Sequence, residues 1–334
     1  MSLNPVLLIG GSGVVGRQTA KWFRERHPQV PLLIGGRNLQ TARDVAHKVG
    51  AAQAIAIDLD KPGLGLEGDV QVSAVVMLAP DEALNGLAYA QNQHVPYLSI
   101  VNGLVEVGPE LALFAHRATA APVILASHWM AGAAMFLALK AVSNFDITHS
   151  IRLGAIIDEN DLAGPAALED MARVHDTAPA ALAFEKGRRV WLSGDAVNGT
   201  VQAIDGRSLA AKAFSTFDTA SLYSATGVPN IRFDLVTDAS SHRLKGGETA
   251  AEIVVEVEGE IGGKAQRLRA TLEFKEGLAS LTGLCVALSL SCALGLNDRS
   301  PSTPGLYLPE MLWETEAFID VLIRSGVEVT EVAP

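Results

Sequence analysis

The stretch Val6-Leu7-Leu8-Ile9-Gly10-Gly11-Ser12-Gly13-Val14-Val15-Gly16 joins a short apolar run to a glycine-rich loop near the start of the 334-residue chain. Residues 6–9 are typical of a buried strand, and residues 16–25 predict an amphipathic helix. In the G-x-G-x-x-G pattern, the glycines allow a tight turn, close approach of a pyrophosphate to backbone N–H groups, and packing of helix on strand. The loop therefore predicts dinucleotide binding at a helix N-terminus, the alternative being a tight turn without a ligand. We expect the contacts to come from Gly10, Gly11, Ser12, Gly13, Val14, Val15 and Gly16.

Further apolar runs alternate with amphipathic segments over the first 130 residues. They predict strands at residues 6–9, 31–35, 54–57, 72–78, 97–101 and 123–126, with helices at 16–25, 39–49, 82–92 and 109–119. Strands and helices that alternate at this spacing form parallel sheets with crossover helices. The fold class is therefore α/β, with a doubly wound parallel sheet of the Rossmann type over residues 1–127.

The pattern changes after Ser127. A long apolar helix is predicted at residues 131–142, followed by strands at 151–157, 189–192, 201–204, 231–236, 252–260 and 266–274. The last two strands alternate in polarity and are joined by Ile261-Gly262-Gly263-Lys264, which predicts a hairpin. We expect residues 128–299 to form an α+β domain with a mixed or antiparallel sheet, used for substrate binding and dimerisation. A last helix is predicted at 310–325, and residues 300–334 are expected to pack back on the first domain.

Composition excludes several classes of function. The net charge of −11 argues against nucleic acid, because phosphate backbones are held by clustered Lys and Arg. Cys285 and Cys292 suit two buried thiols, and no His/Cys spacing suggests a metal site. Residues 277–296 carry no charge, but their serines and acidic flanks favour a buried helix over a membrane span. With no cationic leader at the N-terminus, we expect a cytoplasmic protein with a small-molecule substrate.

The end of the second predicted strand bears on the choice of cofactor. It reads Gly35-Gly36-Arg37-Asn38, without the Asp or Glu that holds the ribose 2′-hydroxyl of NAD. An arginine at this point can bind a 2′-phosphate, so we predict NADP(H), with Arg37 and Asn38 at that phosphate. The alternative is an ordinary surface arginine. Asp58 is expected either at the adenine edge or as a solvated loop acid, and Ala79 and Pro80 near the nicotinamide ribose.

Together, the glycine loop and Gly36-Arg37-Asn38 resemble the NADP-binding half of saccharopine dehydrogenase-like oxidoreductases. Ordered C-terminal pieces extend the resemblance over nearly the whole chain: Val257-Glu258-Gly259, Gly263-Lys264, Thr282-Gly283, Ala293-Leu294-Gly295 and Gly305-Leu306-Tyr307-Leu308-Pro309-Glu310. The family includes saccharopine reductases and carboxynorspermidine dehydrogenases. The resemblance implies hydride transfer between NADPH and an imine made from an amine and an oxo acid, and a homodimer through the second domain's sheet.

Two departures from the family leave the substrate undefined. Tyr97-Leu98-Ser99 stands where many members have Tyr-x-Asp, and Met130-Ala131-Gly132 where they have Pro-Gly. Three readings of function therefore stay open. The first is an NADP-dependent oxidoreductase acting on an imine or secondary amine beside a carboxylate, in amino-acid or polyamine metabolism. The others are an NADPH-dependent enoyl or carbonyl reductase and a non-catalytic NADP-sensing regulatory protein.

Candidate catalytic residues follow the fifth and sixth strands, because ligands in open α/β sheets lie beyond the carboxyl ends of strands. Asn102 follows the fifth strand, and His128 follows the sixth. Histidine titrates in the range useful for protonating an imine nitrogen, so His128 is the candidate general acid, the alternative being a packing histidine. Charged groups that could bind substrate, or simply be solvated, are Asp158-Glu159-Asn160-Asp161, Arg173 with His175, and His242-Arg243 with Lys245.

Overall fold

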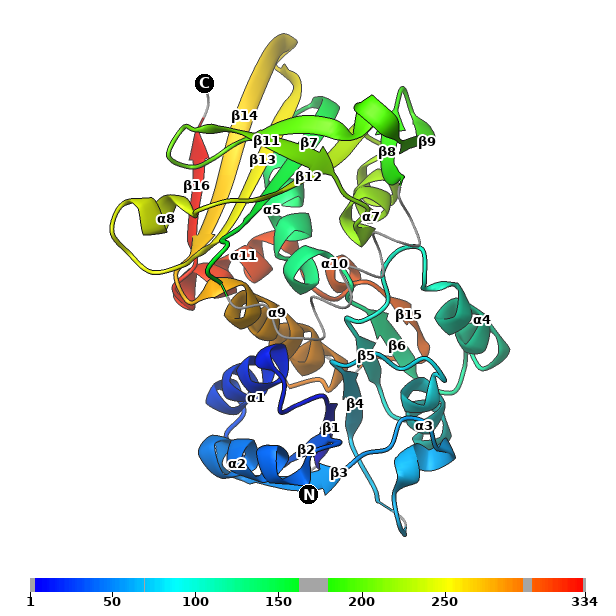
Figure 1. The fold of residues 1–334 in the computed structure, drawn as a ribbon. Coiled ribbons are helices and arrows are strands. Elements are labelled where there is room, and N and C mark those ends of the chain that lie inside the picture. The colour runs from blue at the N-terminus through cyan, green and yellow to red at the C-terminus, as the bar shows by residue number, and fades with distance from the viewer. Residues whose placement is uncertain (1–3, 69, 162–179, 297–301, 333–334) are drawn as a thin grey trace. The chain divides into compact units, whose positions relative to one another are not determined.

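The computed structural model describes residues 4–68, 70–161, 180–296 and 302–332 (Figure 1). The chain forms two compact units. The described part of the first comprises residues 4–127 and 282–313, and that of the second comprises residues 128–161, 180–281 and 314–332. The change of unit after Ser127 falls where the sequence pattern changes.

The first unit contains a parallel sheet with the strand order β15-β6-β5-β4-β1-β2-β3. Strand β1 pairs with β2 on one side and β4 on the other, so the order reverses beside β1, as in a doubly wound sheet. The predicted α/β class and six-stranded sheet are confirmed, and β15 adds a seventh strand on β6. The strands are β1 (Val6–Ile9), β2 (Leu32–Gly36), β3 (Ala52–Ala56), β4 (Ala74–Met77), β5 (Tyr97–Ser99), β6 (Pro122–Leu125) and β15 (Gly305–Tyr307).

Helices cover both faces of this sheet, with α1 and α2 on one face and α3 and α4 on the other (Figure 1). This explains why all four residues of β1 are buried. The helices are α1 (Val14–Arg26), α2 (Leu39–Val49), α3 (Asn85–Gln93), α4 (Gly108–His116) and α10 (Pro309–Leu312), with a short turn η1 (Pro62–Gly65).

Helix α9 (Gly277–Ala293) packs closely on α1 through a glycine. A Cβ added to Gly283 would lie 2.6 Å from the backbone nitrogen of Thr19, so only glycine allows this approach. Farther along, a ring nitrogen of His27 and Ser291 Oγ share a 2.7 Å hydrogen bond. The 17 residues of α9 form the buried helix that the uncharged stretch predicted. Within the described residues, no helix has the length and hydropathy required to cross a membrane.

The second unit contains a mixed sheet with the order β10-β11-β12-β7-β13-β14-β16, and β8 joins β12 and β9 at its side. Strands β7 and β12 are parallel, whereas the other described pairs are antiparallel. The predicted hairpin is present: Ile261 pairs with Lys264, and Gly262 and Gly263 have φ of 58° and 72° in the turn. The strands are β7 (Ile147–Ile157), β8 (Ala181–Glu185), β9 (Arg188–Leu192), β10 (Asn198–Gln202), β11 (Ser208–Ala213), β12 (Asn230–Thr237), β13 (Ala251–Ile261), β14 (Lys264–Phe274) and β16 (Glu328–Val332).

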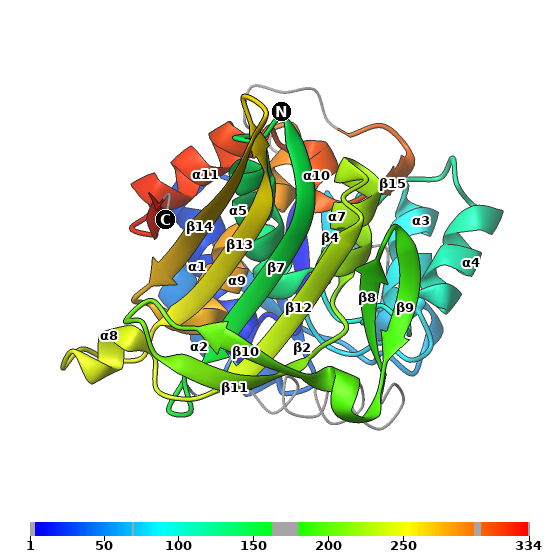
Figure 2. The same ribbon diagram turned by 90° about the horizontal axis from the view of Figure 1, so that it is seen from above.

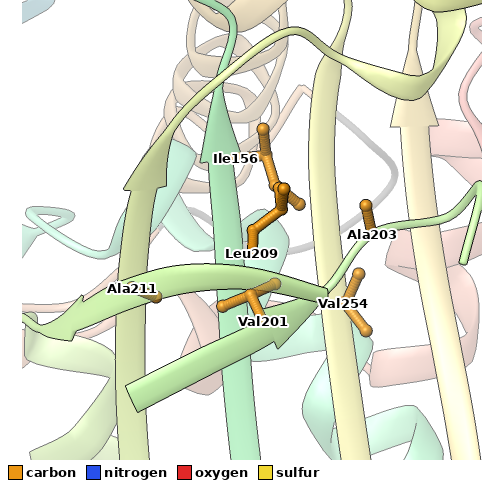
Figure 3. Packing of buried hydrophobic residues seen from close by; sticks show 6 residues of the cluster. All are labelled: Ile156, Val201, Ala203, Leu209, Ala211 and Val254. Carbon is orange, nitrogen blue, oxygen red and sulfur yellow. The ribbon is translucent and has the colours of Figure 1, made fainter. Parts of the chain in front are cut away.

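Other elements pack on both faces of this sheet and cover part of it. Helix α5 (Ala133–Val142) packs on β13 and β14, and its Phe136 ring stacks on Phe318 of α11 (Thr315–Arg324), with centroids 3.8 Å apart. The β10–β11 ribbon crosses the sheet, as Figure 2 shows. Its apolar side chains cover Ile156 and Val254 (Figure 3). A Cβ on Gly154 would lie 2.6 Å from Val201 Cγ1, so this glycine admits the ribbon. The remaining elements are α7 (Phe217–Thr226), α8 (Ser241–Leu244), η2 (Trp129–Gly132) and η3 (Gly194–Val197).

The C-terminal segment differs from the sequence-based expectation. Instead of one helix at 310–325, the chain forms α10 and α11, interrupted at Trp313 and Glu314. Strand β15 pairs with β6 of the first sheet, whereas β16 pairs with β14 of the second. Residues 300–334 were expected to pack on the first domain, but only the part up to Trp313 belongs to it.

Candidate functional site

The glycine loop continues directly from β1 and is held by backbone hydrogen bonds. Gly10 N donates to Gly35 O at 3.0 Å, and Gly13 N donates to Gly10 O at 2.9 Å. Side chains would disrupt this packing, because a Cβ on Gly16 would lie 2.2 Å from Gly10 O and 2.6 Å from Gly11 Cα. Gly10 also has a φ of 79°, which favours glycine. The sequence therefore holds the chain in a tight turn at the carboxyl end of β1.

The N-terminus of α1 at this turn offers backbone donors. Gly13 is the N-cap, no side chain caps the helix by a hydrogen bond, and the first turn carries no acid. The first amides of a helix have no intrahelical partner, and the helix dipole adds partial positive charge there. A side chain on Gly13 would narrow the turn, since its Cβ would lie 3.1 Å from Gly10 O. The cradle therefore fits the pyrophosphate of a dinucleotide.

The end of β2 places Arg37 and Asn38 in different roles. Arg37 is exposed, and its side chain forms no hydrogen bond or ion pair with the part of the chain that the structure describes. Asn38 is the N-cap of α2, because its Oδ1 accepts hydrogen bonds from Gln40 N at 3.0 Å and Thr41 N at 3.1 Å. A Cβ on Gly36 would lie 3.2 Å from Ser12 Oγ, so this strand end borders the glycine loop. Arg37 is thus accessible to an anion, whereas Asn38 keeps only its amide N–H₂ group for a ligand.

Asp58 and residues 79–80 were expected near the other parts of the dinucleotide. Asp58 instead pairs with Lys61 Nζ at 2.8 Å, and the hydrogen bond from Lys61 lowers the pKa of its carboxyl. Its side chain is 41% exposed, and both its place at the adenine edge and the solvated loop acid stay open. A Cβ on Gly10 would lie 3.0 Å from the Ala79 Cβ, so the segment after β4 does border the glycine loop.

A buried polar cluster lies beside β5. Tyr97 OH donates a hydrogen bond to Glu110 Oε1 at 3.2 Å, and both residues are at most 1% exposed. Burial raises the pKa of Glu110, the nearby Asn102, Tyr97 and Ser99 side chains lower it in part, and the charge of Asp81 raises it further. Asn102, a predicted site residue, is half-buried and lies near this carboxyl.

Glu110 and Asp81 were missed as members of this cluster. Glu110 follows Gly108 and Pro109 in the first turn of α4, where an acid ordinarily complements the helix dipole from the surface. Asp81 is 3% exposed, and its carboxyl accepts hydrogen bonds from Gly86 N at 2.7 Å and Asn85 N at 3.1 Å at the start of α3. For Asp81, the available signal was its place just before a helix. For Glu110, it was a tyrosine 13 residues earlier.

His128 belongs to the second unit and is only 5% exposed. Its Nε2 shares a 2.7 Å hydrogen bond with Ser221 Oγ, and its ring lies 5.6 Å from that of Phe217. Burial lowers the pKa of His128 to about 3, so its imidazole is neutral at neutral pH. The geometry supplies a hydrogen-bonding group, and its role as a general acid stays a prediction.

The backbone after His128 is strained. Met130 and Ala131 both have a φ of 52°, and Gly132 follows with 116° at the start of α5. Non-glycine residues in this region cost about 1–3 kcal/mol each. Trp129 N donates to the buried carboxyl of Asp218 at 2.7 Å, which helps to hold the turn.

The charged groups of the second unit pair with one another. Arg243 Nε donates to Asp158 at 3.0 Å, and Arg243 Nη2 donates to Glu159 at 2.8 Å. Asp161 accepts a 2.8 Å hydrogen bond from Leu278 N at the start of α9. The structure thus brings together two of the groups proposed to bind substrate, the acidic Asp158-Glu159 pair and Arg243, and their opposite charges compensate one another. Arg173 and His175 lie outside the described residues.

Neither cysteine forms a disulfide, and both thiols are buried. In the described ranges, no three or more His, Cys, Asp or Glu side chains gather as a metal site would require. The dinucleotide cradle and the Glu110 cluster are therefore the features of the first unit from which a function can be argued.

Comparisons with known proteins support the fold. A comparison with protein-family models finds no match, and neither does one with curated proteins. Among solved structures, saccharopine dehydrogenase (L-Glu forming) from Saccharomyces cerevisiae aligns with a TM-score of 0.65 and 12% identity, covering 99% of this chain and 100% of that one. The chain shares the saccharopine dehydrogenase fold.

Two further structures show weaker likeness. GenD2 from gentamicin A biosynthesis, solved in complex with NAD, has a TM-score of 0.52 at 14% identity, covering 100% of this chain and 97% of that one. An oxidoreductase domain protein from Kribbella flavida has a TM-score of 0.50 at 13% identity, covering 99% and 100%. The fold-level resemblance to saccharopine dehydrogenase inferred from the sequence is confirmed.

Proposed function

We propose that this chain is an oxidoreductase that uses NADP(H) and acts on an imine or secondary amine beside a carboxylate. The observation that carries the dinucleotide part is the glycine cradle at the uncapped N-terminus of α1. Exposed Arg37, at a strand end that lacks an acid, supports NADP over NAD. The shared fold with saccharopine dehydrogenase supports the C–N part.

Different residues would bind the different parts of the cofactor. The glycine loop would hold the pyrophosphate, Arg37 with the Asn38 amide the 2′-phosphate, and Ala79 and Pro80 would border the nicotinamide ribose. When bound, NADP(H) supplies hydride chemistry at its nicotinamide ring. Asp58 is paired with Lys61, and its contact with the adenine edge stays a prediction.

Substrate chemistry would fall to Asn102 and His128. The Asn102 amide can donate and accept hydrogen bonds. A neutral His128 imidazole can also hydrogen-bond, but it becomes a general acid only if ligand binding raises its pKa. A loss of less than about tenfold in turnover for His128→Ala would remove it from the catalytic role.

A charge-matched pair of variants tests the cofactor assignment. Arg37→Ala should weaken NADPH binding about 10- to 100-fold, because it removes charge-assisted contacts, and leave NADH binding nearly unchanged. Arg43→Ala removes another exposed arginine, from α2, and should change both affinities little. An unchanged ratio of NADPH to NADH affinity in Arg37→Ala would refute the assignment.

Turnover identifies the reaction. NADPH oxidation should depend on both an amine and an oxo acid across a panel of such pairs. Turnover of an enal or simple carbonyl without an amine would instead identify an enoyl or carbonyl reductase. Binding of NADPH without turnover of any class would favour the regulatory protein.

The proposal includes a homodimer through the sheet of the second unit, which rests on the family resemblance. Polar contacts lie on this sheet: Arg267 and Glu256 of the long hairpin form a 2.9 Å ion pair, and His149 of β7 shares a 3.2 Å hydrogen bond with Glu260. An interface at this point would therefore be polar. Analytical ultracentrifugation at several salt concentrations should detect a dimer, and a monomer at every concentration would contradict this part.

A further inference from the structure

Helix α7 holds two consecutive residues of the second unit, His128 and Trp129. Ser221 Oγ and His128 Nε2 share a hydrogen bond of 2.7 Å, and Trp129 N donates to Asp218 Oδ2 at 2.7 Å. Asp218 and Ser221 lie three positions apart on α7, so they share one face of the helix. That face therefore fixes both the imidazole of His128 and the backbone amide of the next residue.

The hydroxyl of Ser221 is buried against His128. Ser221 is 3% exposed, and within the part of the chain that the structure describes its Oγ forms a hydrogen bond with His128 alone. A serine hydroxyl carries one proton to donate. If Oγ accepted a hydrogen bond from Nε2–H, its own O–H group would be buried without an acceptor, which is unfavourable. Hydrogen-bond accounting therefore makes Ser221 the donor and His128 Nε2 the acceptor.

The direction of this hydrogen bond determines where His128 carries its ring proton. Burial lowers the pKa of His128 to about 3, so the imidazole is neutral at neutral pH and carries one proton. When Nε2 accepts a hydrogen bond, that proton is on Nδ1. We propose that Ser221 is a positioning residue that holds His128 as the Nδ1–H tautomer, so that the imidazole meets a ligand as a hydrogen-bond donor.

This inference rests on the proposed function, because it takes the oxo acid of that reaction as the ligand. An Nδ1–H group suits an acceptor, such as a carboxylate or carbonyl oxygen, and offers nothing to an ammonium group. A neutral imidazole that gave up its remaining proton would become an anion, so this tautomer binds a ligand rather than protonating it. Ser221 would thus assign His128 to recognition of the oxo acid.

The first test needs no ligand. Nuclear magnetic resonance of the full-length protein, labelled at its histidine nitrogens, distinguishes protonated from unprotonated ring nitrogens at neutral pH, and His128→Gln identifies the signals of His128. The wild type should show the proton on Nδ1, and Ser221→Ala should shift both nitrogens toward a mixture of tautomers. Ser224→Ala is the matched control on the same helix and should change neither, because the exposed Ser224 hydroxyl donates to Ala220 O. A wild-type proton on Nε2, or unchanged signals in Ser221→Ala, would overturn the proposal.

The second test uses pyruvate as a probe oxo acid, with NADPH present. The dissociation constant of pyruvate, followed by the Nδ1 signal of His128, should rise about two- to tenfold in Ser221→Ala, the range expected for the loss of one neutral hydrogen bond. Ser221→Thr keeps the hydroxyl and should restore the wild-type affinity. Methylammonium offers no acceptor, so its binding should not depend on Ser221. Equal affinity for pyruvate in the wild type and Ser221→Ala would contradict the donor role.

The two tests separate the possible failures. If the wild type binds no pyruvate, the substrate part of the proposed function fails together with the ligand assigned to His128, whereas the nitrogen signals still decide the tautomer. If Ser221→Ala does not fold, the wild type and Ser221→Thr remain to be compared. Both should carry the proton on Nδ1, and a proton on Nε2 in either protein would count against the role of Ser221.

Discussion

Replacing Asp158 by asparagine removes one negative charge from a buried site and nearly preserves the shape of the side chain. Asp158 is fully buried and accepts hydrogen bonds from Ser240 N at 2.8 Å, Ser240 Oγ at 2.6 Å and Arg243 Nε at 3.0 Å. Burial alone would raise the pKa of Asp158, but hydrogen bonds from Ser240, Asn160 N and Arg243 outweigh it and lower the pKa from 3.8 to about 2.

The size of the Asp158 pKa shift determines the expected effect on the free energy of unfolding. A pKa lowered from 3.8 to about 2 corresponds to about 2 kcal/mol in favour of the ionised folded state. Solvent screens part of the attraction, because a quarter of the Arg243 side chain is exposed. We therefore expect Asp158→Asn to lower the free energy of unfolding at pH 7 by about 1–2 kcal/mol.

The sign of the pH dependence follows from the lowered pKa. The contribution of Asp158 is complete above the unfolded value of 3.8 and is lost as pH falls toward about 2. Urea unfolding followed by circular dichroism should therefore show a difference between wild type and Asp158→Asn that shrinks in acid.

Glu159→Gln provides the matched control, because Glu159 binds the same arginine at 2.8 Å but is 58% exposed. Exposed ion pairs contribute about 0–1 kcal/mol, so this variant should change stability little. Equal losses in the two variants, or a difference that does not depend on pH, would refute the account. A structural Asp158 would also mean that this carboxylate is not available to a substrate amine.

Three further predictions concern the cofactor cradle and His128. Gly16→Ala would place a Cβ 2.2 Å from Gly10 O, so NADPH binding should be lost and the melting temperature should fall, whereas Gly108→Ala, in open space, should change neither. Asn38→Ala removes the α2 cap, so chemical denaturation should show a free energy of unfolding about 1 kcal/mol lower. Asn38→Asp should keep that stability but weaken the binding of NADPH more than that of NADH, because its carboxylate repels the 2′-phosphate. Equal effects on the two affinities would mean that Asn38 lies away from the 2′-phosphate. The lowered pKa of His128 contributes stability above pH 6.5 that is lost as pH falls toward about 3. His128→Gln should therefore lose less stability than the wild type over that range when unfolding is measured against pH. An unchanged slope of the unfolding free energy against pH would contradict this.

Local patterns predicted much of the fold. The β1 strand, the glycine loop and the β13–β14 hairpin could be predicted because strand period, helix period and turn glycines are recognisable within a short stretch of sequence. Strand β15 has only three residues and pairs with β6, far earlier in the chain. Its pairing, and that of β16, depends on contacts between distant segments that no local period indicates.

The dependence on contacts between distant segments also limited what could be predicted of the candidate site. The cradle and exposed Arg37 could be placed because they follow strand ends, but the oxygen of Asn38 is used in a helix cap. Asp158 and Arg243 were assigned separately to substrate binding, although they bind each other across 85 positions of sequence. The burial of Glu110 also depends on a tertiary neighbour, Tyr97, and its surface-like position in the first turn of α4 concealed it.

The division of the C-terminal segment affects how the protein is made. The first unit needs β15 to pair with the edge of β6, and Gly283 of α9 to pack on α1. A ribosome releases both long after residue 127, so the nascent first unit remains incomplete while the second sheet is being synthesised. Its closing contacts join segments that are far apart in sequence, which is typical of slow folding steps. Until Trp313 has emerged, the β6 edge offers unpaired backbone groups, and the nascent chain is exposed to aggregation there.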